Sequence, residues 1–377
     1  MTASTPAARR RERLIAIVIL AVAGAYLAFG LRTAANSFGC DFSAYFGAAN
    51  DWLAGRPIYD LSVASTGTCG TYQYPPPFVL VALPFSLFGF TIGTWLWVGF
   101  LLACWAIGTA ILPVRLPIRW LVLLLTAIGW PLVFGVRIGQ VAPILYLAFA
   151  VGWRSLDRPA VLGASVAIGT LVKLQPGLLG LWLIARREWR ALAWAIGVGL
   201  AIVAVSAVLG LADWVGMATL LRSLTDAVTN DANIAIGATL HRQGLDAQVA
   251  GLVQVANTIA MLAIVVFAAL RFRPGASFLV AVVASQVISP IVWTHYNLVL
   301  MLPVAWLLDR RQWWAVVIPV AQIWILVPFI PLWSYTVQFY VVLIAVLAVG
   351  WRDGREPVGR RVAARPPLQV GAGEPLA

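Results

Sequence analysis

The sequence predicts an all-α membrane protein, a bundle of about twelve transmembrane helices. Of its 377 residues, 62% are hydrophobic and only 11% are charged, whereas soluble domains carry roughly 25% charged residues. The mean hydropathy is +0.90. Apolar runs close to the length of a membrane span recur along the whole chain, and a span needs about 20 residues. These observations together predict a polytopic helical protein.

The first span is predicted directly after the basic segment RRRERL. No small-residue cleavage site follows it at the expected place, so we expect an uncleaved span that enters from the cytoplasm. A chain that crossed the membrane with every apolar segment would finish with its basic tail outside. Either one segment between 76 and 153 is therefore expected not to cross fully, or one of the segments is divided at the wrong place. The predicted segments are 14–31, 76–90, 92–112, 120–136, 141–153, 160–173, 176–185, 191–210, 248–270, 276–290, 296–308, 313–330 and 335–350.

Arginine-rich loops set the orientation of these spans. Basic loops between spans lie on the cytoplasmic side, which explains the net charge of +12 without a nucleic-acid partner. The side of the basic segment 113–119 stays open. The predicted cytoplasmic segments are 185–190, 271–274, 309–311 and the tail 351–377, which we expect to be disordered after a single membrane domain over 1–350. The predicted external segments are 32–75, 173–175, 211–247, 289–297 and 331–336.

The first external loop contains a predicted interfacial helix over 42–53. Its apolar residues recur at helical spacing and form one stripe, while Ser43, Asn50 and Asp51 lie on the other side. Gly55 and Pro57 end the pattern. The segment is too short and polar to span, so we expect it to lie along the membrane surface. Asp41 stands at its start, either as the N-cap residue or as a carboxylate that faces a cavity.

Two further polar residues stand out against their apolar surroundings. Lys173 is the only lysine of the chain and lies at the tip of an apolar hairpin, TLVKLQPGLLG. It either extends to the lipid headgroups or binds an anionic ligand, and we favour the ligand because buried cations are costly. His295 lies in SPIVWTHYN beside aromatic residues, and either a structural or a functional role is open to it.

The remaining signals are weaker. The segment TYQYPPPF over 71–78 is either a stiff entry to a helix or an aromatic support for a sugar ring, and Gln140 interrupts two apolar segments. Cys40 and Cys69 share one loop and are predicted to pair if it faces an oxidising compartment. No P-loop, H-E-x-x-H or G-x-S-x-G motif is present. No metal-binding spacing is seen, so neither a metal nor a cofactor is expected.

The order of these segments resembles glycosyltransferase family 87, whose members are membrane enzymes of the GT-C class that use polyprenyl-phosphate sugars. The resemblance rests on segments spread over residues 41 to 310, and the NDANIAIG segment is less polar than the family pattern. The matching segments are DFSAYFGAANDWLAGRPIYD, YQYPPPF, GQ at 139–140, VKLQPGLLGLWLIARREW, NIAIGATLHR and SPIVWTHYN.

The resemblance implies a hexosyltransferase, with mannose as the expected sugar, a polyprenyl-phosphate donor and a glycolipid or glycan acceptor. It places the active site on the external face of the plasma membrane, and the reaction is expected to invert the anomeric centre. Asp41 and His295 are the implied catalytic residues, and Lys173 is the implied phosphate ligand. Sugar or acceptor contacts are expected from Tyr45, Tyr74, Gln140, Gln175, Asn233, Trp293 and Tyr296.

Two other classes of function fit parts of the sequence. A transporter or lipid flippase could have the same number of spans, although no repeat divides the chain into two halves. An accessory membrane subunit would make Asp41, Lys173 and His295 dispensable. Labelled product from a polyprenyl-phosphate sugar would exclude both.

Overall fold

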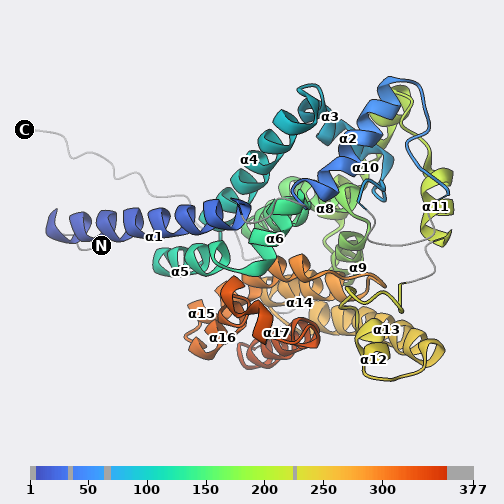
Figure 1. The fold of residues 1–377 in the computed structure, drawn as a ribbon. Helices are drawn as coiled ribbons and strands as arrows, with labels where there is room; N and C mark the ends of the chain where they lie inside the picture. The colour runs from blue at the N-terminus through green and yellow to red at the C-terminus, as the bar shows by residue number, and fades with distance from the viewer. Residues whose placement is uncertain (1–5, 33–36, 63–68, 224–226, 355–377) are drawn as a thin grey trace, which may run out of the picture.

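The described part of the chain is helical, as the sequence predicts. The computed structural model describes residues 6–32, 37–62, 69–223 and 227–354, and over these residues it contains helices and no β-strand (Figure 1). The bulk of the predicted basic tail, 355–377, lies outside the described residues. One isolated antiparallel bridge joins Gly129 to Ile323.

Five of the described helices are long and apolar enough to span a membrane. Their most apolar windows are only 11–56% buried inside the protein, so much of their apolar surface faces outward. A helix that is hydrophobic all round and not covered by protein is suited to lipid, which supports a multi-pass membrane protein. These helices are α1 (Pro6–Arg32), α4 (Gly89–Ala110), α10 (Trp189–Val208), α13 (Ala247–Arg271) and α17 (Trp333–Arg352).

Shorter apolar helices fill the interior between them. Several begin with proline in their first turn, where its missing N–H costs nothing. The predicted segment 120–136 is two helices, because Gly129 is extended and Trp130 N–H bonds to Gln322 O at 2.6 Å. The shorter helices are α5 (Leu116–Ala127), α6 (Trp130–Ile138), α7 (Ala142–Arg154), α8 (Pro159–Val172), α9 (Leu178–Ala185), α14 (Pro274–Val287) and α15 (Met301–Asp309).

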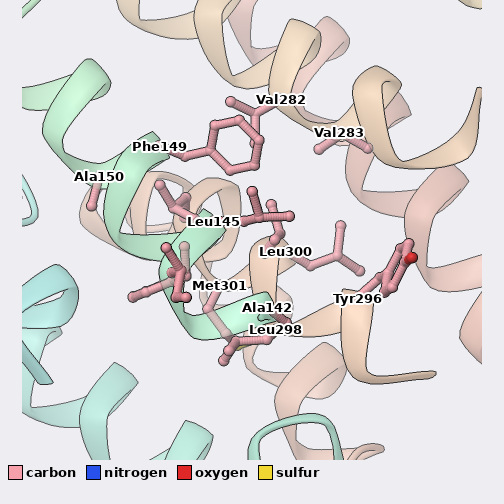
Figure 2. Packing of buried hydrophobic residues seen from close by; sticks show 14 of the residues in the cluster. Ala142, Leu145, Phe149, Ala150, Val282, Val283, Tyr296, Leu298, Leu300 and Met301 are labelled. Atoms are coloured by element: carbon pink, nitrogen blue, oxygen red, sulfur yellow. The ribbon is translucent and has the colours of Figure 1, made fainter. Parts of the chain in front are cut away.

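The core lies where α7, α14 and the start of α15 meet. Figure 2 shows Leu145 and Phe149 of α7 beside Val282 of α14, with Leu300, directly before α15, and Met301, its first residue, close by. All are buried. Each fully buried aliphatic or aromatic side chain contributes roughly 1.5–3 kcal/mol by leaving water. This packing fixes the 3₁₀ segment η3 (Thr294–Leu300), which precedes α15 and carries His295.

Basic loops gather at one end of the molecule. Arg115 pairs with Asp309 at 2.7 Å, and Arg310 pairs with Asp353 at 2.8 Å. Arg154 donates to Ile111 O at 3.2 Å. These contacts connect the predicted cytoplasmic loops to one another. They also place the segment 113–119, whose side the sequence left open, with the basic loops.

The segment 76–90 does not form one span. It comprises η1 (Pro76–Phe78), α3 (Val79–Ser86) and a turn at Gly89, which has a φ of 73°. An eight-residue helix is about 12 Å long, too short to cross about 30 Å of hydrocarbon. By the same criterion α6 and α7, with nine and 13 residues, are also too short, so which segment between 76 and 153 does not cross stays a prediction. The number of segments that cross a bilayer stays a prediction.

The segment 313–330 is likewise not one regular helix. It is divided into η4 (Trp313–Val316), α16 (Val317–Val320) and η5 (Trp324–Phe329). Pro319 and Pro328 lack the N–H groups that a continuous helix uses. Gln322 between them instead bonds to Gln338 of α17. The expectation of a single helix here is wrong.

The two long loops that are predicted to be external contain short helices. These are α2 (Cys40–Leu53) in the first, and α11 (Trp214–Ser223) and α12 (Ile236–Arg242) in the second. Phe42, Tyr45 and Ala49 of the predicted stripe are 0% exposed. The stripe therefore packs inside the protein, and the expectation that it lies on lipid is wrong for these residues. Only Leu53, at 54%, is largely exposed.

Candidate active site

A cavity of about 1020 Å³ joins the polar residues that the sequence singled out. Asp41, Lys173 and His295 all line it, although they are far apart in the sequence. Its walls come from the loop that contains α2, from α6, the α8–α9 junction, the loop that contains α11, the segment 288–296 and the start of α17. Binding pockets have volumes of about 300–1,000 Å³, so this cavity has room for a sugar and part of a second substrate.

Asp41 does not cap its helix. The N-cap position is Gly39, with φ at 75°, and no side chain caps the helix. The N-cap interpretation of Asp41 is therefore wrong, and its carboxylate instead accepts a hydrogen bond from Gln140 Nε2 at 2.8 Å. Burial raises the pKa of Asp41 to about 6, against the opposing effects of Lys173 and Gln140. A carboxylate with this pKa is ionised at neutral pH and still basic enough to take a proton.

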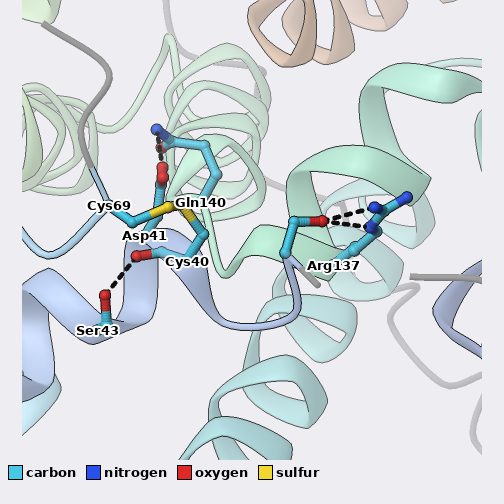
Figure 3. The surroundings of a disulfide bond; sticks show 7 residues. Cys40, Asp41, Ser43, Cys69, Arg137 and Gln140 are labelled. Atoms are coloured by element: carbon cyan, nitrogen blue, oxygen red, sulfur yellow. Dashed lines mark hydrogen bonds between the residues drawn. A yellow bond between two sulfur atoms is a disulfide. The ribbon is translucent and has the colours of Figure 1, made fainter. Parts of the chain in front are cut away.

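Two cross-links hold the chain around Asp41 (Figure 3). Cys40 forms a disulfide with Cys69, with 5.0 Å between their Cα atoms, so the predicted pairing is confirmed. On the other side, Arg137 donates to Ser37 Oγ at 2.5 and 2.9 Å, and its carbonyl accepts from Gly39 N–H at 2.9 Å. The loop on both sides of the helix start is therefore attached to its neighbours.

Gln140 explains the polar interruption seen in the sequence. The preceding residue, Gly139, ends α6 with φ at 85°, and a Cβ there would lie 2.8 Å from Phe42 Cβ. Only glycine allows α2 to approach so closely. Gln140 Nε2 then bonds both Asp41 and the Tyr74 hydroxyl, the latter at 3.1 Å. Its Oε1 accepts the Val141 N–H at 2.5 Å, which fixes the orientation of the amide.

Lys173 lines the cavity. It follows α8 in extended conformation, and its ammonium donates to the Tyr296 hydroxyl. Nζ also lies 3.9 Å from the ring centroid of Tyr296 and 5.7 Å from that of Tyr74. Burial lowers the pKa of Lys173 to about 7, and Asp41 opposes this shift. None of the ion pairs among the described residues involves Lys173, so its charge is available to an anion.

His295 is buried, with 3% of its surface exposed, and it lines the cavity. Neither ring nitrogen has a hydrogen-bond partner among the residues that the structure describes. The backbone of α6 comes close enough that a Cβ on Gly135 would lie 3.2 Å from His295 Cβ. Burial and the nearby Lys173 hold the pKa of His295 well below its usual value, so the ring is neutral at pH 7.

The other predicted contact residues divide into two groups. Tyr74, Gln140, Gln175, Trp293 and Tyr296 line the cavity, and Gln175 also bonds Gln286 Oε1 at 3.3 Å. Tyr45 and Asn233 are absent from the lining. Tyr45 lies behind the wall, where its hydroxyl donates to that of Tyr74 at 3.0 Å.

Asn233 has a structural role in this fold. Its amide donates to Ala227 O and Pro290 O, at 2.6 and 2.8 Å. The side-chain oxygen Oδ1 accepts from Ala235 N–H and Val292 N–H, at 2.9 and 2.8 Å. With these bonds the side chain joins the loop 211–247 to the SPIVWTHYN segment. Both polar atoms of the Asn233 side chain are used in this way, so neither is available to a substrate.

Sequence reasoning missed three aromatic residues of the described cavity lining. Trp130 and Phe134 of α6 lie in a segment that looks like any apolar span, with ring centroids 4.6 Å apart. Tyr335 lies in PLWSYT, where an aromatic residue near a predicted interface is unremarkable. Only its unpartnered buried hydroxyl distinguishes it, and that is visible in the structure alone.

Comparison with known proteins identifies relatives of this chain. The model of glycosyltransferase family 87 matches residues 72–290. A curated relative from Mycolicibacterium smegmatis (strain ATCC 700084 / mc(2)155) is 27% identical over 329 residues, which cover 80% of this chain and 77% of the relative. That protein is named as a polyprenol-phosphate-mannose-dependent alpha-(1-2)-phosphatidylinositol pentamannoside mannosyltransferase.

Proposed function

Because the chain belongs to glycosyltransferase family 87 and is a membrane glycosyltransferase, we propose that it transfers mannose from a polyprenyl phosphate to a glycolipid. The acceptor hydroxyl oxygen attacks the anomeric carbon. The bond from that carbon to the phosphate oxygen breaks, and the phosphate leaves with the electron pair. The named activity of the mycobacterial relative supports both the mannosyl donor and the lipid-linked acceptor.

The observation that carries the proposal is the presence of one carboxylate and one lysine in the same cavity. Asp41 is the only carboxylate among the described residues that line it. A double displacement with retention needs a second carboxylate about 5–5.5 Å from the first, whereas a single displacement with inversion can use one base. We therefore assign Asp41 as the general base, which takes the proton of the attacking hydroxyl.

Lys173 is assigned to the departing phosphate. Its ammonium lies in the cavity, fixed by Tyr296, and it can stabilise the negative charge that develops on the leaving oxygen. His295 is a weaker candidate for the base. Its lowered pKa makes it a poor proton acceptor at pH 7, so the role proposed for it is a hydrogen bond to a substrate.

The active site is proposed to lie on the external face of the plasma membrane. Many of the cavity-lining residues lie in segments that alternation places opposite the arginine-rich loops. We predict that Asn230→Cys, at the cavity, reacts with an impermeant maleimide on intact cells, whereas the exposed Arg271→Cys reacts only after permeabilisation. The background is Cys104→Ala, which retains the disulfide. Labelling of Arg271→Cys on intact cells would reverse the orientation.

The assigned base is tested by Asp41→Asn in the purified protein, with radiolabelled polyprenyl-phosphate mannose and a membrane lipid extract as acceptor. The asparagine oxygen can still accept from Gln140, so folding should be unchanged. Loss of the base should lower turnover by about 10²–10⁴-fold. The matched control is Asp51→Asn on the same helix, whose carboxylate pairs only with the exposed Arg56. Near-normal turnover by Asp41→Asn would refute the assignment.

A further inference from the structure

The Tyr335 hydroxyl takes no part in the chemistry described above, and Tyr335 lines the cavity together with His295. The Tyr335 hydroxyl and both ring nitrogens of His295 are buried and have no hydrogen-bond partner among the described residues. Tyr335 is 1% exposed and His295 is 3% exposed, and both line the cavity. They come from separate elements, α17 and η3.

The structure holds these two elements against each other. Asn297, which lies in η3 with His295, donates its side-chain amide to the Tyr335 carbonyl at 3.1 Å. The next residue of α17, Thr336, donates its hydroxyl to Ile234 O at 2.8 Å. The backbone that carries Tyr335 is therefore bonded on two sides. The absence of a partner for its hydroxyl is not the result of a loosely held segment.

Unpartnered polar groups of this kind are unfavourable for the protein alone. A buried donor or acceptor without a partner is costly, and three such atoms here belong to two residues that line one cavity. A ligand hydroxyl can supply both a donor and an acceptor, which suits a tyrosine hydroxyl and a neutral imidazole. The aromatic neighbours Trp130 and Phe134 on the same cavity wall offer apolar surface to the C–H face of a sugar ring.

We propose that Tyr335 and His295 form a recognition site for sugar hydroxyl groups in this cavity, and that Tyr335 determines sugar specificity. This inference rests on the proposed function. The hydroxyl could belong to the donor mannose or to the acceptor glycan. A site built around buried hydrogen-bonding groups discriminates strongly against an analogue that lacks the matching hydroxyl, because its own groups are then left unpaired.

The test compares Tyr335→Phe with Tyr340→Phe in the full-length purified protein. Tyr335→Phe removes an unpartnered hydroxyl, so the thermal midpoint should stay the same or rise, while kcat/KM should fall about 5–100-fold. Tyr340 lies on the same helix but outside the cavity lining, and its hydroxyl donates to Asn257 at 2.9 Å. Tyr340→Phe should lower the midpoint and leave kcat/KM within about twofold of wild type, since it removes a hydrogen bond that stabilises the fold and lies outside the cavity.

Deoxy analogues identify the source of the hydroxyl. Donors and acceptors lacking single hydroxyl groups are compared in wild type and Tyr335→Phe. The analogue that lacks the recognised hydroxyl should react more slowly with wild type but suffer no additional loss with the variant. If that analogue is a donor, the donor hydroxyl is recognised; if it is an acceptor, the acceptor glycan is recognised. The loss should appear in kcat/KM for that substrate alone.

Two results would overturn the inference. One is a Tyr335→Phe protein whose kcat/KM stays within twofold of wild type for both substrates and whose losses with every analogue equal those of wild type. The other is a fall in thermal midpoint like that of Tyr340→Phe, which would show a structural partner. A wild-type protein without transfer would contradict the proposed function instead. In that case the thermal shift that a mannosyl phosphonate lipid causes is compared between wild type and Tyr335→Phe, because this measurement needs no turnover.

Discussion

The pH dependence of sugar transfer tests the two charged residues together. Asp41 has a pKa of about 6 and must be ionised to take a proton. Lys173 has a pKa of about 7 and must be protonated to stabilise the phosphate. Activity should therefore fall as the pH drops below about 6, where Asp41 becomes protonated, and as it rises above about 7, where Lys173 becomes neutral.

The magnitude follows from these two values. At pH 6.5 about 60% of the free protein has both groups in the active state, and at pH 5 or pH 8 about 9% has, so kcat/KM should be about sevenfold lower at either extreme. The measurement is kcat/KM for the lipid donor in detergent between pH 5 and 9, because this parameter reports the free enzyme.

The substitution Lys173→Arg separates the two limbs. A guanidinium has a pKa above 12 and stays protonated throughout this range. The variant should lose the alkaline limb and keep the acid limb, even if its absolute rate is lower because the bond to Tyr296 changes. An alkaline limb that survives in Lys173→Arg, or a flat wild-type profile between pH 5 and 8, would refute this reasoning.

Two further predictions concern stability. Cys40→Ser or Cys69→Ser removes a disulfide between residues 29 positions apart and should lower the free energy of unfolding by about 3–4 kcal/mol in the chain-entropy model. The double variant should melt at the same temperature as either single variant, and additive losses would contradict a shared bond. Gly163→Ala should destabilise by about 1–3 kcal/mol, because its Cβ would lie 2.3 Å from Ala191 O where α8 meets α10. Gly199→Ala on α10, with nothing within 4 Å, is the control, and equal melting of the two would disprove the close packing.

The class of protein follows from the sequence alone, which also predicts the sides of its loops. Apolar length and the positions of arginine are local properties, and the bilayer acts on them directly. They were sufficient to predict a helical bundle and to gather Asp41, Lys173 and His295 on one side. The order of motifs also sufficed for the family resemblance, which the family match confirms.

Which side chains meet is known only from the tertiary structure. The bonds between Gln140 and Asp41 and between Tyr296 and Lys173 join residues that are far apart in the sequence. The periodicity of a sequence cannot predict such pairs. The same reason explains the errors. Asn233 had the polarity of a ligand-binding residue, but the fold uses its whole amide.

The stripe of α2 and the hydroxyl of Tyr335 both show what a sequence pattern cannot predict. An amphipathic pattern states that one face must be covered, and it is silent on whether lipid or protein covers it. Here α3 and α4 do so for Phe42, Tyr45 and Ala49. Tyr335 shows no special pattern at all, because what sets it apart is a partner that the surrounding chain fails to provide. A missing hydrogen-bond partner can be recognised only when the positions of all neighbouring residues are known.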